Sequence, residues 1–218
     1  MIDIVFPKNN EKEFLKIAEK LGYKNLCFVY PYKTKIKKIE SKKINIFYGV
    51  LAKPNESQKA KSSLVIVKSS DKDRDVFERV KPDIIFGLEA SKRKDFMHHR
   101  NSGLNQILCK LATKNKIIVA FPLKLLLGAE KMLRAQFIGR IKQNIKLCRK
   151  YKVKTIIASF GEDPYEMRAP SDLISLGISF GMHPKEAKEA LQNTLDKINL
   201  NIKKKGKDYI AEGIELVS

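Results

Sequence analysis

Five consecutive polar residues in the middle of the chain could bind an anion or a metal ion. They are His98, His99, Arg100, Asn101 and Ser102. Ser102 is a residue type that caps helices, and the apolar residues behind it recur at the spacing of one helix face, at Leu104, Ile107, Leu108 and Leu111. Because free N–H groups and the helix dipole attract anions at a helix N-terminus, the pattern predicts an anion-binding segment that leads into a helix.

Catalysis by a metal ion or a nucleophile finds little support in the other residues. The third histidine, His183, precedes Pro184, which suits a residue at the start of a helix. The first strand has no H-x-H pair, and the chain has neither a nucleophile elbow nor a glycine-rich phosphate loop. The acidic residues at 162–166 could serve acid–base chemistry, but beside Arg168 we interpret them as an ion-paired loop. We therefore expect no catalytic metal and no cofactor bound by this chain.

The charge of the chain points to a polyanionic partner. It has 44 Lys and Arg against 24 Asp and Glu, a net charge of +20. Residues 96–161 hold 14 of the basic residues and one acid, Glu130. A uniformly lysine-rich composition would not predict this segregation, so nucleic acid is the first candidate partner and an anionic membrane the second. Aromatic RNA-recognition signatures are missing, which favours contact with phosphates and RNA shape.

Three features of the sequence bear on the compartment in which the protein works. The three cysteines, Cys27, Cys109 and Cys148, lie within apolar patterns without C-x-x-C spacing, so we expect buried free thiols. The most apolar run, 117–127, is too short to span a bilayer and contains Pro122 and Lys124. The first residues do not resemble a signal peptide. We expect a cytoplasmic protein with no membrane association.

Short runs rich in Ile, Val and Phe alternate with helical patterns along the chain. The runs occupy 2–6, 25–30, 45–51, 63–67, 83–86, 117–121 and 155–159. They are mostly continuous rather than alternating, as in strands of a parallel sheet that is covered on both faces. A doubly wound sheet is possible, but seven strands in about 160 residues favour an α/β barrel. No linker divides the chain, so we predict one domain over 1–218.

The longest predicted helix, 129–154, contains two arginines that do not fit its apolar face. Arg134 and Arg140 fall on or beside the arc formed by residues such as Phe137 and Ile141. A lone guanidinium there is costly unless it is paired. Each could therefore pair with a carboxylate or extend into solvent, or reach a contact surface with RNA or protein.

Four segments in order resemble one family. They are HHRNSGLNQILCKLA, the basic helix RAQFIGRIKQNIKLCRKYKV, the strand and loop TIIASFGEDPYEMRAPSDL, and GM before the last helix. Together they resemble the archaeal and eukaryotic ribonuclease P protein component 3 family, and the likeness is best over 83–191. The first 80 residues add the opening strand IDIVFP and matching strand spacing.

The resemblance implies a single-domain, distorted TIM-like barrel. The barrel would be related to the polymerase-and-histidinol-phosphatase class but would lack its metal ligands; the first strand here has Asp3 and no histidine. The resemblance further implies a subunit of ribonuclease P, the ribonucleoprotein that removes the 5′ leader from precursor tRNA. In that family the RNA subunit cuts with magnesium, and this protein pairs with component 2 beside the other protein subunits. The chain alone would not be catalytic and would meet precursor tRNA indirectly.

Eight residues are the candidate RNA- or partner-binding positions. The motifs contribute Arg100, Asn101, Arg134, Arg140 and Arg168, and the basic region adds His98, His99 and Lys124. Two other functions remain open from the sequence. One is a stand-alone metal-dependent hydrolase of the barrel class, and the other is a generic basic RNA-binding protein.

Overall fold

The computed structural model describes residues 1–36, 38–60, 62–205, 209–211 and 214–215. Within them, seven strands form one parallel sheet whose order follows the sequence. All seven predicted strands are confirmed, with ends shifted by no more than two residues. They are β1 (Ile2–Val5), β2 (Asn25–Pro31), β3 (Asn45–Leu51), β4 (Val65–Lys68), β5 (Ile84–Phe86), β6 (Ile118–Pro122) and β7 (Thr155–Ala158).

The sheet curls until its first and last strands nearly meet, which makes a barrel. Beyond the end of β7, the N–H of Phe160 donates to the carbonyl of Ile4 at 2.8 Å. The buried Asp3 carboxylate also joins the two strands, because its Oδ1 accepts the N–H of Ser159 at 2.7 Å. Burial raises the pKa of Asp3 to about 6, against the smaller effect of its hydrogen bonds. We call this junction the barrel seam.

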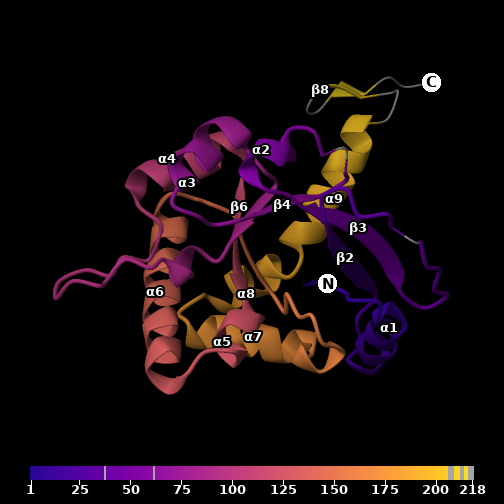
Figure 1. Cartoon of the computed structure of the whole chain (residues 1–218), viewed down its shortest axis with the longest axis horizontal. Coiled ribbons are helices and arrows are strands. Elements are labelled where there is room, and N and C mark those ends of the chain that lie inside the picture. The colour runs from indigo at the N-terminus through magenta and orange to yellow at the C-terminus, as the bar shows by residue number, and fades with distance from the viewer. Residues whose placement is uncertain (37, 61, 206–208, 212–213, 216–218) are drawn as a thin grey trace.

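Helices surround the barrel, as Figure 1 shows. Glu11–Lys20 forms α1 and ends before Gly22, whose φ of +80° terminates the helix. The other helices are α2 (Pro54–Ser57), α3 (Asp73–Asp75) continuing as the π-helical η1 (Val76–Val80), η2 (Leu88–Ala90), α4 (Gln106–Asn115), α5 (Leu123–Leu127), α6 (Lys131–Lys150), η3 (Pro164–Glu166), α7 (Pro170–Ser179), α8 (Pro184–Ala190) and α9 (Asn193–Lys205). A hairpin of β8 (Tyr209–Ala211) and β9 (Ile214–Glu215) follows α9.

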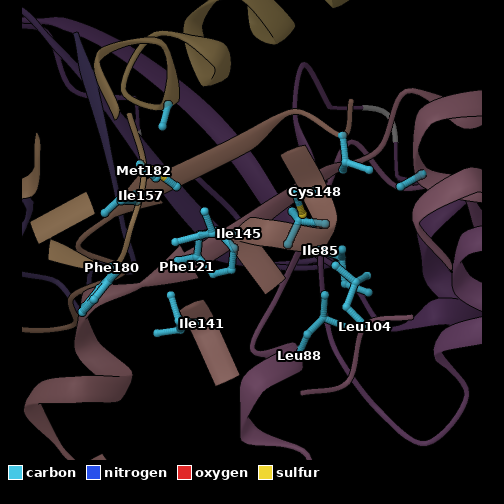
Figure 2. Packing of buried hydrophobic residues seen from close by; sticks show 14 of the residues in the cluster. Ile85, Leu88, Leu104, Phe121, Ile141, Ile145, Cys148, Ile157, Phe180 and Met182 are labelled. Carbon is cyan, nitrogen blue, oxygen red and sulfur yellow. The ribbon is translucent and has the colours of Figure 1, made fainter. Parts of the chain in front are cut away.

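Apolar side chains pack on both faces of the sheet. Alternate strand residues such as Ile4, Ile66 and Ile156 form one cluster inside the barrel, which Ile198 of α9 joins. Figure 2 shows part of a second cluster outside, where Ile141 and Ile145 of α6, Leu104 and several strand residues pack together. Burial on both faces explains why the strand sequences are continuously apolar. The three cysteines are buried free thiols, as predicted.

The helix after the polar segment begins later than predicted. Its N-cap is Asn105, whose Oδ1 accepts the N–H of Leu108 at 2.9 Å. The predicted cap, Ser102, instead hydrogen bonds to α6, and Gly103 then turns the chain with φ +78°. The rotated helix leaves Ile107 53% exposed and buries Cys109. The polar residues at 98–101 therefore belong to a loop and do not form a helix N-terminus.

The predicted single domain includes residues 206–208, 212–213 and 216–218, which lie outside the described ranges, and it stays a prediction. Within the part of the chain that is described, no helix is both long enough and apolar enough to cross a bilayer.

Candidate functional site

Arg140 of α6 holds the base of the loop between η2 and α4. Its side chain is 1% exposed. Nη1 donates to the carbonyls of Glu89 at 2.9 Å and Ser91 at 2.6 Å, and Nη2 donates to the carbonyl of Arg93. Asp95 completes the set, because its Oδ1 accepts from Nε at 2.9 Å. An enclosed guanidinium cannot reach a partner, so the predicted external contact of Arg140 is wrong and the alternative, pairing with a carboxylate, is correct.

The next turn of α6 holds the end of the same loop. The side-chain amide of Gln143 donates to the carbonyl of Arg100 and to Oγ of Ser102, both at 2.9 Å. Asn144 donates to the carbonyl of Ser102, also at 2.9 Å. Sequence reasoning missed these two α6 residues. The available signal was their spacing from Arg140, which puts polar groups on a face that also carries apolar residues.

We call residues 92–101 the basic loop; it is part of the segment that extends away from the barrel beside α6 in Figure 1. Lys92, Arg93 and Lys94 are exposed. The charge of the loop's acid, Asp95, is already paired with Arg140. Burial raises the pKa of Asp95, but hydrogen bonds from Arg140, Asn101 and Gln136 outweigh that effect and the net pKa is lowered. The field of the loop toward solvent is therefore positive.

The structure places the predicted HHRN residues at the end of this loop. His98, His99 and Arg100 are exposed. Asn101 is half-buried and structural, since its N–H donates to Asp95 Oδ1 at 2.9 Å and its amide donates to the carbonyl of Lys94. The Arg100 side chain lies across Gly139 of α6, where an added Cβ would stand 2.5 Å from its Nε.

A cleft of about 810 Å³ lies beside the basic loop, between it and the turn after β4. Two acids, Asp71 and Asp73, line the cleft together with six basic residues: Lys68, Arg74, Lys92, Arg93, His99 and Arg100. The Asp73 carboxylate accepts hydrogen bonds from the Ser69 hydroxyl and from the N–H of Ser70. Arg74 pairs with Glu78 at 3.8 Å, and the remaining basic residues outnumber the acids, so the cleft carries a net positive charge that suits phosphate.

The other predicted site residues lie outside this cleft. Lys124 pairs with Glu162 at 3.0 Å, and Arg168 donates to the carbonyls of Tyr165 and Met167 at 2.8 and 2.7 Å. Arg134 is exposed on the first turn of α6 and donates to a carbonyl just before it. The structure thus brings together five of the eight predicted residues: His98 to Asn101 in the basic loop, and Arg140 at the base of that loop.

The acidic loop at 162–166 is ion-paired, but its partners differ from the predicted one. Glu162 pairs with Lys8 at 2.6 Å as well as with Lys124. Hydrogen bonds from these lysines lower the pKa of Glu162, against a smaller opposing effect of burial. Nη1 of Arg168 donates to two backbone carbonyls instead of to these carboxylates. His183 caps α8, where its N–H donates to Glu186, as expected for a helix start.

The C-terminal mouth of the barrel, where TIM-like barrels carry their active sites, is mostly apolar. A cavity of about 570 Å³ there is lined by Phe6, Leu51, Phe86, Phe160 and other residues. Phe86 and Phe160 stack with ring centroids 5.0 Å apart. Within the described residues, no three His, Cys, Asp or Glu side chains are grouped to hold a metal ion.

Curated relatives of this chain are proteins of the ribonuclease P apparatus. Ribonuclease P protein component 3 of Methanosarcina acetivorans is 32% identical over 129 residues, which cover 57% of this chain and 54% of the relative. The match to the first curated relatives thus spans only about half of their length.

Two solved structures share the fold. One is a chain of the cryo-EM structure of archaeal ribonuclease P with mature tRNA, with TM-score 0.83 and 20% identity over 100% of this chain and 98% of that chain. The other is the histidinol phosphate phosphatase of Lactococcus lactis, with TM-score 0.59 and 9% identity over 84% of this chain and 94% of that chain. They confirm the predicted TIM-like barrel fold.

The family model described as RNase P subunit p30 matches residues 2–207, nearly the whole chain. The order of motifs, the barrel and this match agree, and the chain therefore belongs to the RNase P subunit p30 family.

Proposed function

We propose that this chain is a protein subunit of ribonuclease P, the ribonucleoprotein that cleaves the 5′ leader from precursor tRNA. Membership of the RNase P subunit p30 family supports the place of this chain in that assembly. The observation that carries an RNA-binding role is the basic loop, whose base Arg140 fixes to α6 while its cationic side chains remain exposed beside the 810 Å³ cleft. Cationic side chains on a backbone that is already held in place bind an RNA backbone with less ordering cost than those on a free loop.

In this proposal the chain supports catalysis by others and does not react with the substrate itself. The RNA subunit cleaves with magnesium, and this chain holds no cofactor. It works in the cytoplasm with protein component 2 and the other protein subunits, and meets precursor tRNA only through the assembled particle. Its own residues neutralise phosphates and so help the catalytic RNA to fold.

Reconstitution tests this function. Precursor tRNA cleavage is measured with ribonuclease P RNA and the other protein subunits, with and without this chain, at limiting magnesium. We expect omission to remove most of the activity and addition of the chain to restore it. Unchanged cleavage on omission would contradict the proposal. Equal binding to any polyanion, independent of component 2 and of this RNA, would indicate a generic RNA-binding protein instead.

The Arg100 side chain supplies a test at single-residue level. Arg100→Ala is expected to weaken RNA binding about tenfold, the loss of one charge-assisted contact of ~1.4 kcal/mol, because Arg100 is exposed and can reach a phosphate. The melting temperature should stay nearly unchanged, since the loop backbone is held by Gln143 through main-chain groups. Filter binding over a range of salt concentrations and thermal unfolding measure both.

Two further variants control this prediction. Gly139→Ala should displace the Arg100 side chain and weaken RNA binding, while its better helix propensity favours stability by up to about 1 kcal/mol. Arg79→Ala removes an exposed arginine that does not line the cleft and should bind RNA like the unmodified chain. A large loss of stability in Arg100→Ala would instead make Arg100 a structural residue.

A further inference from the structure

The tip of the basic loop carries large apolar side chains where a solvated loop would carry polar ones. Phe96 is 63% exposed and Met97 is 94% exposed. Both lie between Lys94 and His98, so the apolar tip is flanked by basic residue types on each side. Exposed aromatic groups in such a setting indicate a binding surface.

The aromatic ring at this tip has a defined position. The rings of Phe96 and His99 stack with centroids 4.8 Å apart and an angle of 27° between their planes. The N–H of Phe96 also donates to the carbonyl of His99 at 2.9 Å, which closes the turn. One side of the Phe96 ring is thus covered by His99, and most of the ring remains open to a further planar group.

The base of the loop restricts how far this ring pair can move. Arg140 bonds the carbonyls of Ser91 and Arg93 and the carboxylate of Asp95, and Asn101 bonds Asp95 from the other end. The two ends of the loop are therefore tied together at one point. Binding of a partner at the tip therefore costs less conformational entropy than binding to an untethered loop would.

The charges around the ring pair favour nucleic acid over protein as the stacking partner. Lys92, Arg93, Lys94 and Arg100 are exposed on the same loop, and the loop's one carboxylate, Asp95, is neutralised by Arg140. Protein interfaces are depleted of lysine, whereas proteins that bind single strands combine aromatic platforms with a cationic track for the backbone.

We propose that the Phe96–His99 pair is a stacking platform for an unpaired base of an RNA whose phosphates contact the basic loop. This deepens the proposed function and rests on it, but the two fail separately. If cleavage still requires the chain but a Phe96 variant binds RNA normally, only the stacking proposal is contradicted. If cleavage does not need the chain, the proposed function as a ribonuclease P subunit is contradicted.

Binding measurements provide the first test. Phe96→Ala is expected to weaken binding of ribonuclease P RNA roughly 5- to 150-fold at fixed salt, the loss of one base–aromatic stack. Because no charge is removed, the slope of affinity against salt should not change, unlike in Arg100→Ala. Phe96→Trp should retain the affinity. Tyr165→Ala, which removes another exposed ring, 78% exposed and outside the basic loop, should bind normally.

Photo-crosslinking identifies what the ring touches. A benzophenone amino acid at position 96 of the full chain, irradiated in the reconstituted holoenzyme, is expected to crosslink to an unpaired nucleotide of the RNA. The same group at position 165 is the control. Crosslinks from position 96 only to another protein subunit, or only to base-paired nucleotides, would overturn the proposal, and so would equal RNA affinity of Phe96→Ala and the unmodified chain.

Discussion

An Arg140→Met chain is expected to lose about 3–5 kcal/mol of its free energy of unfolding. The substitution leaves the carbonyls of Glu89, Ser91 and Arg93 without this donor, and the Asp95 carboxylate without its ion-pair partner. At this chain length the melting temperature should fall by roughly 6–20 °C. Urea unfolding followed by circular dichroism, together with a thermal scan, measures the loss.

Arg134→Met is the matched control, because it makes the same substitution less than two turns earlier in α6. Arg134 is exposed and donates to the carbonyl of Ala129. Its replacement should cost no more than about 1 kcal/mol. Equal losses in the two variants would mean that the buried arginine does not organise the loop. In the Arg140 variant we also expect weaker RNA binding, since the loop loses its anchor.

Glu89→Gln is expected to stabilise the chain by about 3 kcal/mol at pH 8 and to leave its stability nearly unchanged at pH 4. Glu89 is fully buried, and no bond from another described residue reaches its carboxylate oxygens. Burial raises the pKa of Glu89 from 4.5 to about 7, against a weaker opposing backbone hydrogen bond. A neutral amide of the same shape avoids burying a charge.

The sign of this pH dependence follows from the bound protons. Between pH 4.5 and about 7, the folded chain keeps a proton on Glu89 that the unfolded chain has released. The contribution of Glu89 to the free energy of unfolding therefore falls as pH rises through this interval and is level above it. Denaturant unfolding at several pH values should show the fall in the unmodified chain.

Three further acids help to interpret that experiment: Asp3 and Asp73 are further contributors, and the exposed Glu189 provides a control. In Glu89→Gln the remaining decline belongs to Asp3, whose pKa burial raises to about 6, and to Asp73, whose pKa burial also raises. Glu189→Gln changes an exposed glutamate on α8 and should keep the full pH dependence of the unmodified chain. If Glu89→Gln gave the same profile as the unmodified chain, Glu89 would be ionised in the fold at neutral pH.

The strands were predictable from the sequence because burial on both faces leaves a continuous apolar run for each. The start of α4 was not, since Ser102 and Asn105 are both good cap residues and local sequence cannot rank them. The choice depends on Gln143 and Asn144, which bond Ser102 from α6 and hold it outside the helix. Contacts between residues 41 and 42 positions apart leave no local pattern.

The candidate site was predictable only in its exposed half. His98, His99 and Arg100 were found from residue type and charge, and all three are exposed. The role of Arg140 stayed open because its acceptors are mostly backbone carbonyls, which every sequence has. The buried Glu89 gave no signal at all, and the tip residue Phe96 was overlooked because a lone aromatic residue in a basic stretch fits no local template.

The barrel seam has a consequence for synthesis on the ribosome. Asp3 and Ser159, which join across it, are 156 positions apart. Strand β1 leaves the ribosome well before β7, so one of its edges stays open until β7 and the residues after it have emerged. Such long-range pairing slows folding and leaves an unpaired strand edge that can aggregate. Nascent chains stalled before residue 159 has emerged should therefore depend on chaperones more than nascent chains in which β7 and the seam residues have emerged.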